Sequence, residues 1–473
     1  MEIKLFNTLS RSVEVFKPLE EGKVSMYTCG PTVYHFAHIG NLRTYVSNDI
    51  LKRMFLANGY DVKHIMNFTD VGHLTSDGDT GEDKMEKGSR REGKSVWEIA
   101  KYYTDVFLSD IKKLNILPAT KYTPATQYIQ EQIDLVKKLE DLGYTYKIED
   151  DGIYYDTSKF VDYWKLGGQK LDDLKAGARI EFSDGKRNPS DFALWKFSPK
   201  DAKRQMEWNS PWGVGFPGWH IECSAMSLKE IGDRMDVHTG GVDHIKVHHT
   251  NEIAQVEPVV GHKWVNYWVH MEFLNDLSGK MSKSNGDFLT LSKLEEMGYP
   301  AIVYRYFLLM ASYRKQITFS YELLDGAKNS YENLVKKVIF YYDKSLFEGQ
   351  CFDKTVIEKW KTRILETLNN DLNTAGTIVL LQELLKSDET PATKVELIKF
   401  FDEILGLNLL ENAKNFNGIY SIEVPKEIEK MAEERLKAKK EKNYALADEL
   451  RAKISDAGFI VEDTATGFNI KLK

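Results

Sequence analysis

The first part of the chain alternates between short apolar stretches and segments with one apolar face. Residues 23–28 have the pattern of a strand that ends before Gly30, and residues 61–68 have that of a second strand. Between them, residues 39–58 have the spacing of an amphipathic helix, and a similar alternation resumes near Met235. Strands that alternate with helices favour an α/β fold with a doubly wound parallel sheet.

Three further regions depart from this alternation. Residues 120–210 contain short strand-like stretches separated by turns, which predict an inserted subdomain. From Phe319 onward, apolar residues recur at helical spacing, which predicts a helical bundle. The last segment is basic and ends in two strand-like stretches, which predict a small α+β module. The expected units are the sheet domain in two halves (1–119 and 211–265), the inserted connective subdomain (120–210), a region around residues 280–284 (266–318), the bundle (319–410) and the C-terminal module (411–473).

The composition is that of an ordinary water-soluble protein. Hydrophobic residues make up 42% and charged residues 29% of the 473 residues. No run approaches the roughly 20 apolar residues that cross a bilayer, and the amino terminus does not read as a signal segment. We therefore expect a cytoplasmic protein without a membrane partner. The net charge of −7 means that any nucleic-acid surface must be a local basic patch.

One candidate nucleotide site lies at the junction of the first strand and its helix, in the sequence His35-Phe36-Ala37-His38-Ile39-Gly40-Asn41. Ligands of a doubly wound sheet bind beyond the carboxyl ends of its strands. A helix that begins there offers backbone N–H groups to phosphate, and Gly40 allows close approach. His35 and His38 can stabilise charge that develops at a phosphate. Two ordinary histidines near a helix start would give the same local pattern.

A second candidate segment is Lys280-Met281-Ser282-Lys283-Ser284, which lies between two glycines. Two ammonium groups on such a loop can hold a triphosphate, although a solvated lysine loop is the usual interpretation of two lysines alone. The full KMSKS string together with the upstream HIGN string resembles the paired signature of class I aminoacyl-tRNA synthetases. The resemblance implies a Rossmann-type catalytic domain that binds ATP with Mg²⁺. The implied catalytic residues are His35, His38, Lys280 and Lys283, and the implied ATP-binding residues are His38, Gly40, Asn41, Lys280 and Lys283.

Residues 88–95 match the P-loop pattern GxxxxGK[ST]. That motif binds phosphate where an apolar strand leads into it. The preceding residues 79–87 are densely charged and cannot form a buried strand. We therefore interpret residues 88–95 as a turn before a helix at about 96–107.

The sequence also contains a candidate metal site. The three cysteines, Cys29, Cys223 and Cys351, are too few for a disulfide framework and are expected to be reduced. His248 and Glu252 are four residues apart, so a helix would place both on one face. Two thiolates, one imidazole and one carboxylate suit a tetrahedral zinc at about 2.0–2.3 Å. Spacing alone leaves His220 and His249 as alternatives, and scattered core residues would look similar.

Three segments resemble the cysteine–tRNA ligase family: the one that begins Cys29-Gly30, Gly218 to Met226 (GWHIECSAM), and His248 to Glu252 (HHTNE). The resemblance runs nearly end to end. It implies ATP-dependent activation of L-cysteine and its transfer to tRNA(Cys), by a monomer without an editing domain. A zinc ion would bind the substrate thiolate, which serine's hydroxyl replaces poorly. The family's zinc ligands carry over to Cys29, Cys223, His248 and Glu252, and its cysteine-binding residues to Gly30, Thr69, Trp219 and Asp243.

The resemblance further implies that residues 266–318 contact the tRNA stem, that the bundle binds tRNA, and that the C-terminal module reads the anticodon. Residues 435–453 hold seven basic and three acidic residues. Such a run is usually a solvated helix face, but Tyr444 and Phe468 could stack on unpaired bases. Three departures from the family's pattern put local substrate contacts in doubt: Phe216 for an arginine, Lys246-Val247 for an aromatic-proline pair, and a longer acidic loop between Asp70 and Asp83.

Two other functions share these motifs. One is a ligase that joins cysteine to a sugar amine in thiol-cofactor synthesis, and the segment after Phe319 argues against it. The other is a catalytically silent RNA-binding protein on a synthetase fold, and the intact HIGN, KMSKS and ligand residues argue against that.

Overall fold

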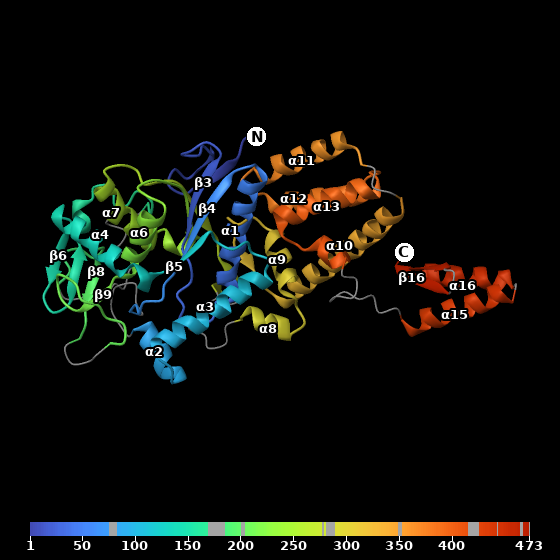
Figure 1. Ribbon diagram of the computed structural model, residues 1–473, viewed down its shortest axis with the longest axis horizontal. Coiled ribbons are helices and arrows are strands. Elements are labelled where there is room, and N and C mark those ends of the chain that lie inside the picture. The colour runs from blue at the N-terminus through green and yellow to red at the C-terminus, as the bar shows by residue number, and fades with distance from the viewer. Residues whose placement is uncertain are drawn as a thin grey trace.

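The computed structural model contains a large α/β part, a helical part and a small C-terminal part (Figure 1). Among the described residues, no helix is both long and apolar enough to cross a membrane. The described residues are 1–74, 83–168, 185–199, 204–276, 279–280, 289–348, 352–414, 425–441, 443–463 and 467–472.

Within these ranges, the central sheet has five strands, all parallel, in the order β11-β10-β3-β4-β5. The chain starts in the middle at β3, extends to one edge through β4 and β5, and returns to the other side of β3 as β10 and β11. The direction of winding therefore reverses between β3 and β10, and ligands bind at such a switch point. The strands are β3 (Lys23–Thr28), β4 (Asp61–Phe68), β5 (Lys121–Pro124), β10 (Met235–Gly241) and β11 (Val265–Met271).

Both faces of this sheet are buried because alternate side chains point to opposite sides. Val24 and Met26 of β3 belong to the core beneath α1 (Ile39–Ala57) and α3 (Val96–Lys113). Tyr27 packs on the other face with residues of α6 (Trp219–Glu230) and α7 (His248–Val260). Helices on both faces of a parallel sheet confirm the doubly wound α/β fold that the alternation predicts.

An antiparallel sheet lies between β5 and β10 in the sequence. Its four described strands follow the order β6-β7-β8-β9 and pack with α4 (Ile129–Asp141). Three of these strands lie within the predicted stretch 120–210, whereas β9 lies beyond its end and β5, at its start, belongs to the central sheet. The strands are β6 (Thr145–Ile148), β7 (Gly152–Tyr155), β8 (Phe192–Phe197) and β9 (Gly215–Pro217).

The segment that matches a P-loop is part of a helix rather than a turn. Helix α2 (Lys84–Glu92) covers residues 88–92, and Gly93, at φ 64°, ends it in the left-handed conformation. Ser95 then caps α3, with Glu98 completing a capping box. Our interpretation of 88–92 as a turn is wrong, and the P-loop interpretation is excluded because the residues that would form the phosphate loop lie in helix α2.

Arg305 joins the helical part to the sheet domain. This fully buried guanidinium donates to the Asp49 carboxylate of α1 at 2.5 Å and to the carbonyls of Leu114 and Leu405 at 3.0 and 2.7 Å. The helices here are α8 (Leu291–Glu296), α9 (Ala301–Leu309), α10 (Tyr321–Glu348), α11 (Lys354–Leu368), α12 (Thr374–Lys386), α13 (Pro391–Leu405) and α14 (Leu409–Lys414). Short strands outside the two sheets described above are β1 (Lys4–Asn7), β2 (Ser12–Val15), β12 (Leu274–Asp276), β13 (Gly279–Lys280) and β14 (Ile317–Thr318).

The C-terminal part packs around a small cluster of its own apolar side chains. It consists of α15 (Lys426–Lys440), α16 (Tyr444–Asp456) and the hairpin of β15 (Phe459–Asp463) and β16 (Phe468–Leu472). Phe468 packs against this cluster, whereas Tyr444 is 60% exposed. Arg435 is buried, so it is not part of a solvated basic face.

Candidate functional site

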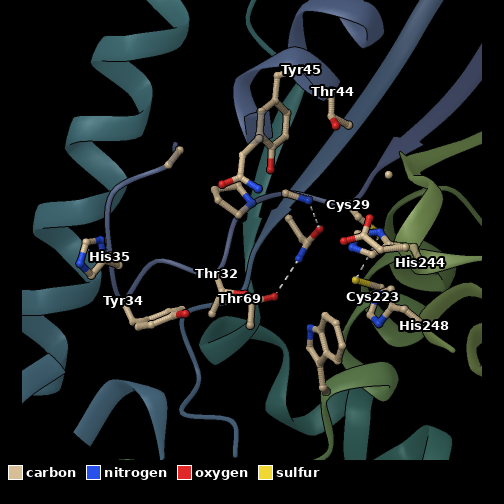
Figure 2. A pocket seen from close by; sticks show the side chains of 18 of the residues that line it. Cys29, Thr32, Tyr34, His35, Thr44, Tyr45, Thr69, Cys223, His244 and His248 are labelled. Carbon is tan, nitrogen blue, oxygen red and sulfur yellow. Dashed lines mark hydrogen bonds between the residues drawn. The ribbon is translucent and has the colours of Figure 1, made fainter. Parts of the chain in front are cut away.

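A cavity of about 200 Å³ opens at the carboxyl ends of β3 and β10, where the winding of the sheet reverses (Figure 2). Cys29 follows β3, and Gly241 ends β10. Helix α6 contributes Trp219 and Cys223, and helix α7 contributes His248. Segments far apart in the sequence therefore meet in one pocket.

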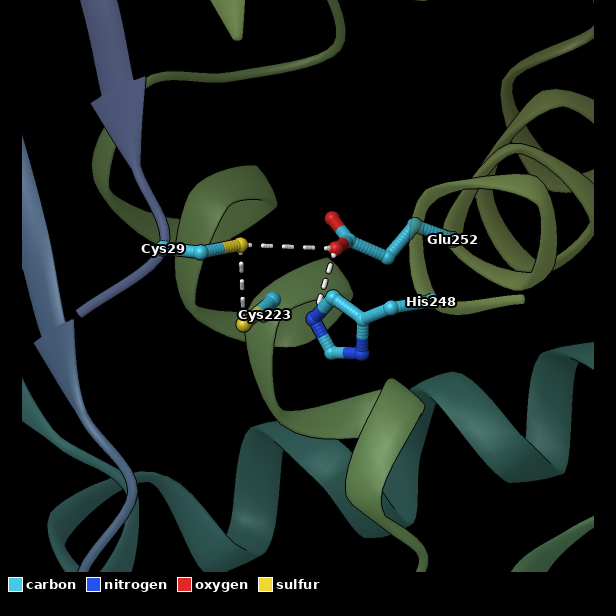
Figure 3. A group of neighbouring side chains, drawn as sticks. All are labelled: Cys29, Cys223, His248 and Glu252. Carbon is cyan, nitrogen blue, oxygen red and sulfur yellow. Dashed lines mark hydrogen bonds and ion pairs between the residues drawn. The ribbon is translucent and has the colours of Figure 1, made fainter. Parts of the chain in front are cut away.

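Four potential metal ligands gather at the base of this cavity (Figure 3). The Sγ atoms of Cys29 and Cys223 are 4.0 Å apart, and Cys29 Sγ lies 3.8 Å from Glu252 Oε1. His248 Nε2 lies 3.0 Å from the same oxygen, and all four donor atoms fall within 4.8 Å of one another. Bonds of about 2.0–2.3 Å in a tetrahedron require donors about 3.3–3.8 Å apart. The four buried side chains therefore fit a zinc ion in number and chemistry, and the separations of 3.0, 3.8 and 4.0 Å lie around the required range.

A second group of donors overlaps with the first. His238 and His249 also lie close to Cys29 and Glu252. Of the two groups, the one with Cys223 and His248 faces the cavity, since neither His238 nor His249 lines it. An ion that meets a bound substrate needs an open side. The geometry therefore favours the group of Cys29, Cys223, His248 and Glu252.

Two further histidines, His220 and His238, contact the candidate ligands without lining the cavity. His238 Nε2 lies 2.8 Å from Glu252 Oε2, and its ring stacks on Trp268 at 4.6 Å between centroids. His220 Nδ1 lies 2.9 Å from His248 Nδ1. Such contacts fix the orientation and protonation of metal ligands. Spacing in the sequence left His220 as an alternative ligand and gave no signal for His238, which only its contact with Glu252 reveals.

The electrostatics of the four residues suit replacement of protons by a cation. A hydrogen bond from Cys29 lowers the pKa of Cys223 to about 7, whereas burial raises the pKa of Cys29 well above its usual value. Burial would lower the pKa of His248, but the Glu252 carboxylate and the Cys223 sulfur raise it to about 10. Protons held at this site thus balance the thiolate and carboxylate charges. A bound dication would balance the same charges in place of the protons.

The residues predicted to bind cysteine line the same cavity, namely Gly30, Thr69, Trp219 and Asp243. Gly30 lies so close to β4 that a Cβ there would be 1.6 Å from the Asn67 carbonyl oxygen. Its N–H donates to Asn67 Oδ1 at 2.7 Å, and Asn67 Nδ2 donates to Thr69 Oγ1 at 3.2 Å. Glycine is therefore required at position 30 because the segment that follows β3 passes this close to β4.

The HIGN segment forms the start of α1 beside the cavity. His38 caps the helix: Nδ1 accepts from the Asn41 N–H at 3.2 Å, and the His38 N–H donates to Asn41 Oδ1 at 3.3 Å. A Cβ at Gly40 would lie 2.9 Å from the His38 ring. His35 and Asn41 line the cavity. The backbone of Lys280 lies in β13, and Lys283 lies outside the described residues.

Two further residues, Lys84 and Arg204, lie where the sequence departs from the family's pattern, and neither was predicted as a site residue. Leu74 bridges to Asp83, and the Lys84 N–H donates to the His73 carbonyl at 2.9 Å, so residues 73–74 and 83–84 lie side by side and Lys84 lines the cavity. Among the described lining residues, Lys84 alone carries an ammonium or guanidinium group. Arg204 lies 3.4 Å above the Phe216 ring and pairs with Asp83. In the sequence, the adjacent residues Asp83 and Lys84 at the end of the acidic loop were the signal that could have identified Lys84.

Comparisons with known proteins identify the family of the chain and proteins that share its fold. The family described as the class I (C) tRNA synthetase catalytic domain matches residues 15–329. Cysteine–tRNA ligase of Treponema denticola is 47% identical over 98% of both chains, and cysteine–tRNA ligase 1 of Burkholderia lata is 47% identical over 99% of this chain and 96% of its own.

Two solved structures share the fold. Methionyl-tRNA synthetase of Mycobacterium tuberculosis with methionyl-adenylate has a TM-score of 0.58 at 15% identity and covers 84% of this chain and 93% of its own. The leucyl enzyme of Agrobacterium radiobacter, in a ternary complex with tRNA, has a TM-score of 0.60 at 12% identity over 86% of both chains. With a matching catalytic family over most of its length and full-length relatives at this identity, the chain belongs to the cysteine–tRNA ligase family of class I aminoacyl-tRNA synthetases.

Proposed function

We propose that this chain activates L-cysteine with ATP and Mg²⁺ and transfers it to the 3′ end of tRNA(Cys), with zinc-dependent selection against serine. The observation that carries the proposal is the group of four buried donors at the base of a cavity lined by Thr69, Trp219 and Asp243. Zinc held by Cys29, Cys223, His248 and Glu252 would supply a Lewis acid that favours a thiolate over a hydroxyl.

The other pocket residues divide the remaining work. Asp243 offers a carboxylate for the amino group of cysteine, and Lys84 offers a cation for its carboxyl group or for the α-phosphate that becomes joined to that group when pyrophosphate leaves. Trp219 lies 4.5 Å from the His248 ring and closes the side of the pocket. The first turn of α1, held by the His38 cap, directs backbone N–H groups toward an ATP phosphate. The KMSKS lysines Lys280 and Lys283 would hold the outer phosphates.

An apolar pocket would discriminate only weakly between the thiol of cysteine and the hydroxyl of serine. A hydrophobic pocket separates substrates that differ by one small group by about 1–3 kcal/mol. Metal coordination distinguishes the two atoms directly, because a bound thiol loses its proton far more readily than a hydroxyl. We therefore infer that no editing step is needed.

The test measures zinc content, cysteine-dependent ATP–pyrophosphate exchange and tRNA charging in the purified chain. We expect about one zinc per chain, exchange with cysteine but not serine, and charging of tRNA(Cys). A metal-free protein that still rejects serine would contradict the role of zinc. Exchange without charging would favour the sugar-amine ligase, and neither activity would favour a silent RNA-binding protein.

A further inference from the structure

The junction of α2 and α3 carries a basic and aromatic surface that the proposed chemistry does not use. We call it the α2–α3 corner. Residues 87–94 include four basic side chains and one acidic one, in a chain of net charge −7. The basic side chains are exposed, and Trp97 and Tyr102 are 48% and 42% exposed. The corner consists of Lys87, Arg90, Arg91, Lys94, Trp97 and Tyr102.

This surface is continuous with the rim of the cavity. Arg91 donates to the carbonyl oxygen of Tyr34 at 3.3 Å, and Tyr34 and His35 line the cavity. Figure 2 shows both residues on the loop that leads away from the cysteine cluster. The His35 ring stacks on Tyr103 at 5.9 Å and 11°. The corner therefore begins where the cavity ends.

A row of rings links His35 to the protein surface. Phe36 packs edge-on against Tyr103 at 5.0 Å and against Tyr102 at 6.2 Å. Tyr102 in turn contacts Tyr103 at 5.0 Å, and Lys94 Nζ lies 4.8 Å from the centre of the Tyr102 ring. An exposed ring beside a cation, with further cations on the preceding helix, is the combination that binds unpaired nucleotides.

We propose that the α2–α3 corner binds the unpaired 3′ nucleotides of the tRNA and guides the terminal ribose into the cavity. This inference rests on the proposed function, since that end of the RNA must reach the activated amino acid. The rings suit the bases and the lysines and arginines suit the phosphates. Single exposed aromatic residues are common and need no partner, but these rings are joined to the cavity rim.

The experiment compares the full-length chain with the double variant Lys94→Ala/Tyr102→Ala. Binding is measured with intact tRNA(Cys) and with the same RNA trimmed of its unpaired 3′ nucleotides. The unaltered protein should bind the intact RNA about tenfold more tightly, and the double variant should lose that preference. Its charging kcat/KM for tRNA should fall about tenfold, while cysteine-dependent pyrophosphate exchange stays unchanged.

Two matched variants serve as controls. Tyr102→Phe keeps the ring and should retain the preference for intact RNA. Lys23→Ala removes a similarly exposed lysine at the opposite, amino end of β3 and should change neither measurement. A double variant that still prefers intact RNA would overturn the proposal, as would a rise in its KM for ATP equal to the loss in charging. Absence of pyrophosphate exchange in the unaltered protein would contradict the proposed function and not this inference. The comparison of intact with trimmed RNA measures binding and does not depend on the exchange reaction.

Discussion

The polar side chains around the cavity are enclosed by the sheet and by α6 and α7, whereas those of the C-terminal part mostly face solvent. Cys29, Cys223, His248 and Glu252 are each no more than 5% exposed and depend on neighbours for their protonation. In the C-terminal part, a small apolar cluster is buried, and Tyr444 is 60% exposed. Changes near the cavity should therefore spread through packed neighbours, whereas changes in the C-terminal part should act only where they are made.

The largest effect is expected for Asp49→Asn, which leaves the buried Arg305 without its carboxylate. Removing one partner of a buried ion pair costs about 3–5 kcal/mol, measurable by urea unfolding. The contrasting variant Glu449→Gln breaks the exposed pair with Lys453 at 2.7 Å and should leave unfolding unchanged. Equal effects of the two substitutions would remove the distinction between the regions.

The pH dependence of stability sharpens the same contrast. Burial would raise the pKa of Asp49, but Arg305 and Arg53 hold it below its usual value. A carboxyl group with a depressed pKa stabilises the fold above its unfolded pKa of about 4, and that stability is lost as the pH falls through the folded pKa. Acid unfolding should therefore shift to higher pH in Asp49→Asn.

Cys223→Ser should abolish zinc binding and lower cysteine-dependent exchange by more than about 100-fold, because it removes a ligand rather than a supporting contact. Zinc analysis and exchange assays of the purified variant check this expectation. Cys351→Ser changes the third cysteine and provides the control, with full zinc content and activity expected. Full zinc content in Cys223→Ser would count against the proposed ligands.

A smaller effect is expected for His238→Phe, which keeps a ring against Trp268 but removes the contact with Glu252. Loss of such a supporting contact lowers metal affinity by about 10–100-fold. Competition with a chelator measures the change. His262→Phe alters a partly exposed histidine that contacts Asp233 and should not change zinc affinity.

The smallest of these effects is expected for Tyr444→Ala in the C-terminal part. Loss of one base-stacking ring should lower charging of tRNA about fivefold and leave pyrophosphate exchange unchanged. Tyr444→Phe should charge normally. A fall in exchange in Tyr444→Ala would mean that the C-terminal part is coupled to the cavity, contrary to the comparison.

The fold was accessible to sequence reasoning where the signal is local. Strand β4 occupies the predicted residues 61–68, and α1 ends one residue before the prediction. The segment at 88–92 was misjudged because its apolar residues are few, and a capped helix packed on α3 does not need a regular stripe. The sequence offered Phe468 as a ring that could stack on unpaired bases, and the structure shows it partly buried against the apolar cluster of its own module.

By itself, the sequence determined the helix and strand alternation, the paired HIGN and KMSKS strings, and the types of residue available to hold a metal. These are properties of short segments. Only the tertiary structure decided which donors meet, because Cys29 and Cys223 are brought together from 194 positions apart by the reversal between β3 and β10. It also placed His248 and Lys84 on the cavity wall and set His249 behind it, against Cys29. Helical spacing fixes the direction of a side chain within its own helix, but the order of strands in the sheet fixes what that side chain faces.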